Sequence, residues 1–215
     1  MIDIREPTTI YQHQRRRPGV IARAGRDAGY VLAMFGLSTA GFWILGACVL
    51  ATAILLPTVI GALVGVASAF VLRWVTDVDR RLAGWYLGRP IRACHRKPSA
   101  PGMVALVKTV GRDPRTWKDA GWVLGNSFAG LALGIVGIVV TSLTISYLAT
   151  PLWWWAVPDP HHNYVVLNLG IYTVTSTSLA LVTSTIGLAL VPVAIAVNRG
   201  IAGAHARMAR SALQD

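Results

Sequence analysis

Long apolar stretches alternate with basic blocks along this chain. Residues 27–72 and 119–198 contain no Lys or Arg and are mostly apolar. A membrane-spanning helix needs about 20 apolar residues to cross a hydrocarbon core of about 30 Å. The first stretch is too long for one crossing and suits two crossings joined by a tight turn. The second suits two more crossings and an outer loop. The pattern therefore predicts an all-α polytopic membrane protein with four transmembrane helices.

The four predicted transmembrane helices cover, approximately, residues 28–49, 56–75, 120–148 and 175–196. The chain between them forms a cytoplasmic segment at 76–119 and an outer loop at 149–174. A basic cytoplasmic tail at 1–27 precedes this membrane domain, which continues to residue 215. Apolar residues recur at helical spacing in 78–87, 102–110 and 201–213. This spacing predicts amphipathic helices, and we expect 78–87 to bend along the inner membrane surface.

The positions of the cationic residues predict the orientation. All 20 Lys and Arg residues lie within 5–26, 73–118 and 199–210. Positive charge near helix ends stays cytoplasmic, so we expect a bacterial plasma-membrane protein with both termini inside. A net charge of +11 in a soluble protein would suggest nucleic-acid binding. With 54% hydrophobic and only 13% charged residues, these charges instead face anionic lipid head groups, and we expect no nucleic-acid partner.

The N-terminus and the two cysteines add two expectations about the membrane protein. The N-terminus is polar and basic and shows no signal peptide, so the first span is expected to be a permanent anchor. The two cysteines, Cys48 and Cys94, are predicted on opposite sides of the membrane, which disfavours a disulfide.

A short sequence repeat links the two halves of the chain. Residues 26–32 match 118–124 at five of seven positions, and the other two positions keep a cation and an aromatic residue. Each copy stands where a basic segment meets an apolar one. We therefore predict two parallel-repeat hairpins related by an axis along the membrane normal. Asp27 and Asp119 are expected to cap the helices that follow them.

The order of several motifs resembles a known family. The motifs are Asp-Pro-Arg-Thr-Trp-Lys-Asp at 113–119, Thr-Pro-Leu-Trp-Trp-Trp at 150–155, Asn-Leu-Gly at 168–170, and Arg-Gly-x-Ala-x-x-His-Ala-Arg at 199–207. Over about residues 20–213 the chain is similar to the sensor domain at the N-terminus of many actinobacterial two-component histidine kinases. The resemblance implies a role in signal transduction.

The kinase part of that family has no counterpart after residue 196. Residues 197–215 contain no ATP-binding module, and His205 lacks the acidic neighbour expected after a phosphoacceptor histidine. We therefore expect no enzymatic activity and no cofactor. The chain is expected to be either a freestanding sensor-like protein or the sensory half of a kinase.

The outer loop holds the candidate ligand-binding residues, which are Trp153, Trp154, Trp155, Asp159, His161 and His162. The tryptophans suit either an aromatic belt at the membrane interface or an aromatic-walled pocket for a lipid-like or cationic ligand. The two histidines beside one acid suit a solvated loop better than a metal or pH site. No metal site is predicted.

Glycines at regular spacing predict close helix contacts. The candidate helix-packing residues are Gly61, Gly65, Gly121, Gly125, Gly130 and Gly134. We expect residues 56–75, or a second copy of the chain, to occupy the groove on 120–148.

The absence of charged residues deep inside the predicted spans disfavours a pump or an intramembrane hydrolase. The favoured function is a sensor that passes an outer-face or bilayer stimulus to a cytoplasmic partner such as a kinase, with the lipid bilayer or a second copy as further partners. The alternative is an accessory subunit of a transporter or another membrane complex.

Overall fold

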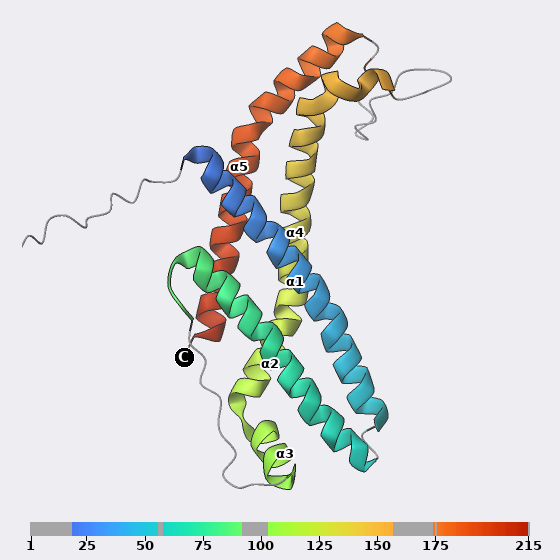
Figure 1. Cartoon of the computed structure of the whole chain (residues 1–215), viewed down its shortest axis with the longest axis vertical. Helices are drawn as coiled ribbons and strands as arrows, with labels where there is room; N and C mark the ends of the chain where they lie inside the picture. The colour runs from blue at the N-terminus through green and yellow to red at the C-terminus, as the bar shows by residue number, and fades with distance from the viewer. Residues whose placement is uncertain (1–18, 56–57, 92–102, 157–173, 175, 215) are drawn as a thin grey trace, which may run out of the picture.

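Four long helices and one short helix make up the described part of the protein. The structure is a computed structural model that describes residues 19–55, 58–91, 103–156, 174 and 176–214. The elements are α1 (Val20–Leu55), α2 (Val59–Leu87), α3 (Met103–Arg112), α4 (Pro114–Trp153), the short 3-10 helix η1 (Trp154–Ala156) and α5 (Thr177–Leu213). The long helices pack into one elongated bundle (Figure 1). These described residues contain no strand, as the all-α prediction requires.

Two of the predicted amphipathic helices are continuations of long helices. Residues 78–87 form the last turns of α2, which is capped at its C-terminus by Gly88 with a positive φ of 67°. Residues 201–213 form the last turns of α5. The prediction that 78–87 bends along the membrane surface was wrong, because this segment continues α2 and its residues Asp79 and Arg80 find partners on α4 inside the bundle. The third predicted helix, at 102–110, corresponds to α3.

Within the described residues, three helices, rather than the predicted four, are long and apolar enough to cross a membrane. They are α1, α4 together with η1, and α5. Helix α2 is not among them. Its second half carries Arg73, Asp77, Asp79, Arg80 and Arg81. Only 11% of the apolar window of α1 is buried within the bundle, so most of its apolar surface faces outward. Such exposure favours a membrane-embedded protein.

The two hairpins point to opposite ends of the molecule, which contradicts the parallel-repeat prediction (Figure 1). Gly41 of α1 lies beside Val123, whereas Val31 lies beside Gly137, so α1 runs antiparallel to α4. The repeat specifies similar local sequence at 26–32 and 118–124 but carries no information on which ends of the helices meet. The antiparallel arrangement is the one that seats the glycines of α4 against α1.

Two glycines of α4 face α1, which is not the partner that the sequence suggested. A Cβ on Gly130 would collide with Ser38 Oγ, and a Cβ on Gly134 would lie 2.7 Å from Phe35 Cβ. By contrast, Gly121 and Gly125 have no atom of another element within 4 Å of such a Cβ. In α2, Gly65 lies opposite Thr52 of α1. The groove on α4 is therefore filled by α1 over part of its length and is open at the other part.

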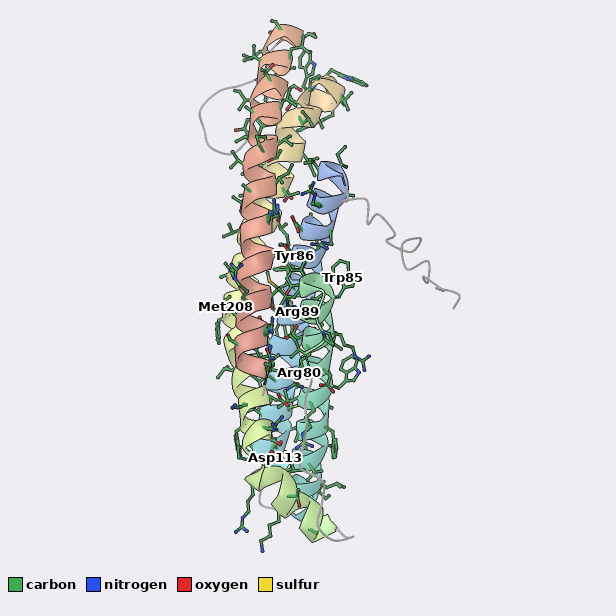
Figure 2. The ribbon with its side chains drawn as sticks, turned by 90° about the vertical axis from the view of Figure 1, so that its left-hand side faces the viewer. Arg80, Trp85, Tyr86, Arg89, Asp113 and Met208 are labelled. Atoms are coloured by element: carbon green, nitrogen blue, oxygen red, sulfur yellow. The ribbon has the colours of Figure 1, made fainter. Side chains whose placement is uncertain are left out.

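Small residues let α5 approach its neighbours closely. A Cβ on Gly187 would lie 2.5 Å from the backbone nitrogen of Leu148 in α4. Farther along, Ala202, Ala206 and Ala209 are fully buried. They belong to a hydrophobic core formed with Tyr30, Val31, Met34 and Ala83. This core surrounds a set of polar side chains, and Figure 2 shows Arg80 of that region within the bundle, with Asp113 towards the end that carries α3.

Candidate functional site

The centre of the bundle contains buried polar side chains from all four long helices. Asp79 of α2 is 3% exposed. Its Oδ2 accepts hydrogen bonds from Trp122 Nε1 at 3.0 Å and from Asn126 Nδ2 at 3.1 Å, both on α4. Its Oδ1 is buried without a hydrogen-bond partner in the described part of the chain. Burial raises the pKa of Asp79, while these two hydrogen bonds and the charge of Arg80 act in the opposite direction.

His205 extends this arrangement to α5 and α1. Its ring is 2% exposed. Nε2 lies 2.7 Å from Asn126 Oδ1, and Nδ1 lies 2.9 Å from the hydroxyl of Tyr30. Because Asn126 donates through Nδ2 to Asp79, its Oδ1 must accept, so Nε2 carries the proton. A neutral His205 then accepts a hydrogen bond from the Tyr30 hydroxyl at Nδ1.

The resulting chain of hydrogen bonds runs from Tyr30 through His205 and Asn126 to Asp79. We call these four residues, with Trp122, the polar core. It connects α1, α5, α4 and α2 in that order. A change in the position of one helix breaks a buried hydrogen bond to another, which costs about 1–3 kcal/mol for each group left unpaired. The polar core therefore couples the positions of the four helices.

Ion pairs join α2 to the first turns of α4 beside the polar core. Arg80 lies 2.7 Å from Asp77 and 2.5 Å from Asp119, and its side chain is 7% exposed. About two turns earlier on α2, Arg73 donates hydrogen bonds to Asp113 at 3.2 Å and to Thr116 at 2.6 Å. Both contacts fix the register of α2 against α4.

The two aspartates of the sequence repeat have different partners and neither begins a helix. Asp27 is the acceptor for the hydroxyl of Tyr86 at 2.9 Å, whereas Asp119 pairs with Arg80. The capping prediction was wrong because both helices begin several residues earlier, at Val20 and Pro114. The residue that caps α4 is Asp113, whose side chain accepts from the backbone nitrogen of Arg115 at 3.1 Å.

The tryptophan run at the end of α4 divides into packed and exposed residues. Trp153 and Trp154 pack against a small cluster of Val174 and Ala180 at the start of α5. Trp155 is 70% exposed. The other predicted ligand residues, Asp159, His161 and His162, lie outside the described residues. Within the described ranges, no group of three or more His, Cys, Asp and Glu residues is placed to hold a metal ion.

Sequence reasoning considered His205 only as a phosphoacceptor and did not find the polar core. A side chain that is 2% exposed is poorly accessible to a kinase domain. One signal was present, since Trp122 and Asn126 are four residues apart in an apolar stretch and therefore share one helix face. Their partners on α1, α2 and α5 are far away in sequence, and only the packing of the helices brings them together.

Comparison with protein families gives one match. The family described as "Putative sensor" matches residues 30–213. The chain belongs to this sensor family. The matched range includes every residue of the polar core. The comparisons with curated proteins and with solved structures gave no match.

Proposed function

We propose that this sensor-family chain is a non-catalytic signal-coupling protein of the bacterial plasma membrane. A stimulus at the outer face or in the bilayer changes the packing of the helices, and α5 passes this change to a cytoplasmic partner. The observation that supports the proposal is the hydrogen-bonded chain from Tyr30 to Asp79, because it includes one residue of every long helix. Movement of any one of these helices therefore strains or breaks a hydrogen bond in the chain that ends on α5.

The orientation that we propose has both ends of the membrane domain in the cytoplasm. Val20 at the start of α1 lines the same surface pocket as Arg199 and Arg207 of α5. Arg26 also lies over the ring of Tyr86, at 5.1 Å from its centroid. Because cations near helix ends favour the cytoplasmic side, we assign this end to the cytoplasm, although the cationic segment 108–118 lies at the opposite end of the bundle, beside α3. The cytoplasmic partner that this arrangement suits is a histidine kinase or a response regulator of a two-component system.

The partner can be identified by crosslinking from α5. A photoreactive residue in place of Met208, which is 40% exposed, should capture a kinase or regulator in native membranes. Asn126→Leu should then change the phosphorylation of that partner, while the captured amount stays similar. Capture of a permease, or phosphorylation that is unaffected by Asn126→Leu, would contradict signal coupling through the polar core.

A second function, as an accessory subunit of a membrane complex, is favoured by a different observation. Gly121 and Gly125 leave an open face on α4 where a helix of another protein could lie. In that case Gly125→Leu should release a co-purifying permease and Asn126→Leu should have the smaller effect. The two substitutions therefore separate the two functions.

A further inference from the structure

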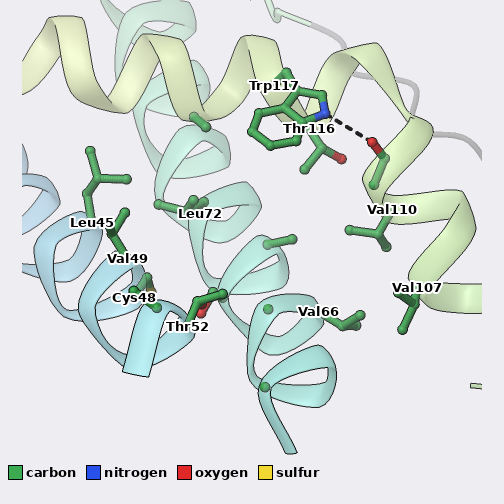
Figure 3. A pocket seen from close by; sticks show the side chains of 17 residues that line it. Leu45, Cys48, Val49, Thr52, Val66, Leu72, Val107, Val110, Thr116 and Trp117 are labelled. Carbon is green, nitrogen blue, oxygen red and sulfur yellow. Dashed lines mark hydrogen bonds between the residues drawn. The ribbon is translucent and has the colours of Figure 1, made fainter. Parts of the chain in front are cut away.

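An apolar cavity lies between the first hairpin and the start of α4, away from the polar core. Its volume is about 480 Å³, within the range of about 300–1,000 Å³ typical of ligand sites. We call it the apolar cavity. Figure 3 shows side chains from α1, α2, α3 and α4 turned towards it. The residues that define it best are Cys48, Thr52, Val66, Leu72, Val110 and Trp117.

The shape of the cavity follows from small residues in its wall. Gly61, Gly65 and Ala69 of α2 face it, so these described positions place no large side chain in the space between α1 and α2. Opposite them, Val107 and Val110 of α3 close the other side. The structure thus brings α3 next to the start of α2, two segments that the charge pattern had placed on opposite sides of the membrane.

The chemistry of the wall excludes a polar ligand. Apart from Cys48, Thr52, Ser68 and Thr116, the lining side chains are apolar. Thr116 is already engaged, because its Oγ1 accepts from Arg73 at 2.6 Å. Burial of a polar ligand here would leave most of its hydrogen bonds unmade, at a cost of several kcal/mol. An alkyl chain suits these walls.

The segment that forms one wall is also rich in exposed cations. Lys108, Arg112 and Lys118 are exposed, and each follows a lining residue directly in sequence, namely Val107, Gly111 and Trp117. The acids of this segment, Asp113 and Asp119, pair with Arg73 and Arg80 of α2. Trp117 is 67% exposed and donates to the carbonyl of Gly111 at 3.0 Å, which suits the level of lipid head groups.

We propose that the apolar cavity binds the alkyl chain of an anionic amphiphile, with its head group among Lys108, Arg112 and Lys118. The wall accounts for the chain, and the excess of exposed cations accounts for the anionic head. The proposal concerns binding alone and holds whether or not the polar core transmits a signal. The amphiphile is either a free fatty acid or an anionic phospholipid, which share this chemistry.

Cys48 provides a direct measure of occupancy. In a Cys94→Ser background it is the only thiol, since the chain has two cysteines. Palmitate added to the purified protein in neutral detergent should slow its reaction with a small maleimide about fivefold or more. Methyl palmitate, which lacks the charge, should protect less, and Lys108→Gln with Arg112→Gln should remove the difference between the two. Phosphatidylglycerol in place of palmitate tests the phospholipid source.

A pair of matched substitutions tests the location. Ala53 lines the cavity, whereas Ala47, on the same helix, does not, and both are exposed. Ala53→Phe should raise the palmitate concentration needed for half-maximal protection about tenfold, as expected when about two buried methylene groups are excluded. Ala47→Phe should leave it unchanged. A photoreactive fatty acid should also crosslink to peptides of α1, α2 or α3 in the otherwise unsubstituted protein, which does not depend on the folding of either variant.

The outcomes are distinct. Protection of Cys48 by only palmitate or only phosphatidylglycerol identifies which of the two amphiphiles binds and supports the proposed site. Equal protection in the Ala53 and Ala47 variants, protection by neither palmitate nor phosphatidylglycerol, or crosslinks confined to α5 would overturn the proposal.

Discussion

The polar core and the apolar cavity both include residues of α2 and α4, yet they are built in opposite ways. In the polar core, Asp79 and Asn126 bond directly across the helix interface. In the cavity, Gly65 and Ala120 stand on these helices and leave space. One region fixes the distance between the helices, and the other allows it to change. A ligand that fills the cavity therefore acts on helices whose positions the polar core reports to α5.

The ion pairs between the two regions should be the most sensitive point. Arg80→Ala leaves Asp119 buried without its cation, and such a loss costs about 3–5 kcal/mol. The neighbouring Arg81 is exposed, so Arg81→Ala should change stability by less than about 0.5 kcal/mol. Denaturant titration in mild detergent measures both. Equal stability of the two variants would mean that the contact between α2 and α4 is not held by Arg80.

Helix contact at the glycines of α4 should have the next largest effect. Gly134→Leu forces a side chain into Phe35 and should cost about 2 kcal/mol or more. Gly125→Leu meets open space and should be neutral or slightly stabilising, because Leu favours a helix more than Gly does. Melting temperatures of the two variants measure this difference in stability. A tolerated Leu at 134 would contradict the antiparallel packing of α1 on α4.

The third expected effect depends on pH and concerns the charge of Asp79. Its pKa in the folded protein is raised, so the unfolded chain releases this proton first as pH rises above about 4. Stability from this group is therefore greatest at low pH and is lost as pH rises through the folded pKa. Asp79→Asn keeps an acceptor oxygen for Trp122 and Asn126 but cannot titrate.

The comparison of wild type and Asp79→Asn isolates this contribution. Burial raises the pKa of Asp79 to about 6, and each unit corresponds to about 1.4 kcal/mol, so the stability of the variant relative to wild type should improve by up to about 3 kcal/mol between pH 4 and neutrality. Unfolding titrations at a series of pH values measure it. A difference that does not vary with pH would show that Asp79 carries the same charge in both states.

Local sequence was sufficient to predict the helices but not their pairing. The apolar stretches predicted α1, α4 and α5, and the spacing of Leu106 and Val110 predicted α3. The sequence could not reveal that α1 runs antiparallel to α4. The repeat of 26–32 at 118–124 shows only that the two segments are locally alike, and it does not say how the two helices pack against each other. For the same reason, residues such as His205 and Tyr30, 175 positions apart, could not be assigned to one site.

The central claim is that the polar core holds α5 in place against the other helices. Spin labels at the exposed positions Arg81 of α2 and Ser211 of α5, in a background without Cys48 and Cys94, report the distance between the helices. We predict one narrow distance distribution for this background and for Gly125→Leu. Asn126→Leu, which removes the bonds to Asp79 and His205, should broaden or shift it. An unchanged narrow distribution in Asn126→Leu would contradict the account.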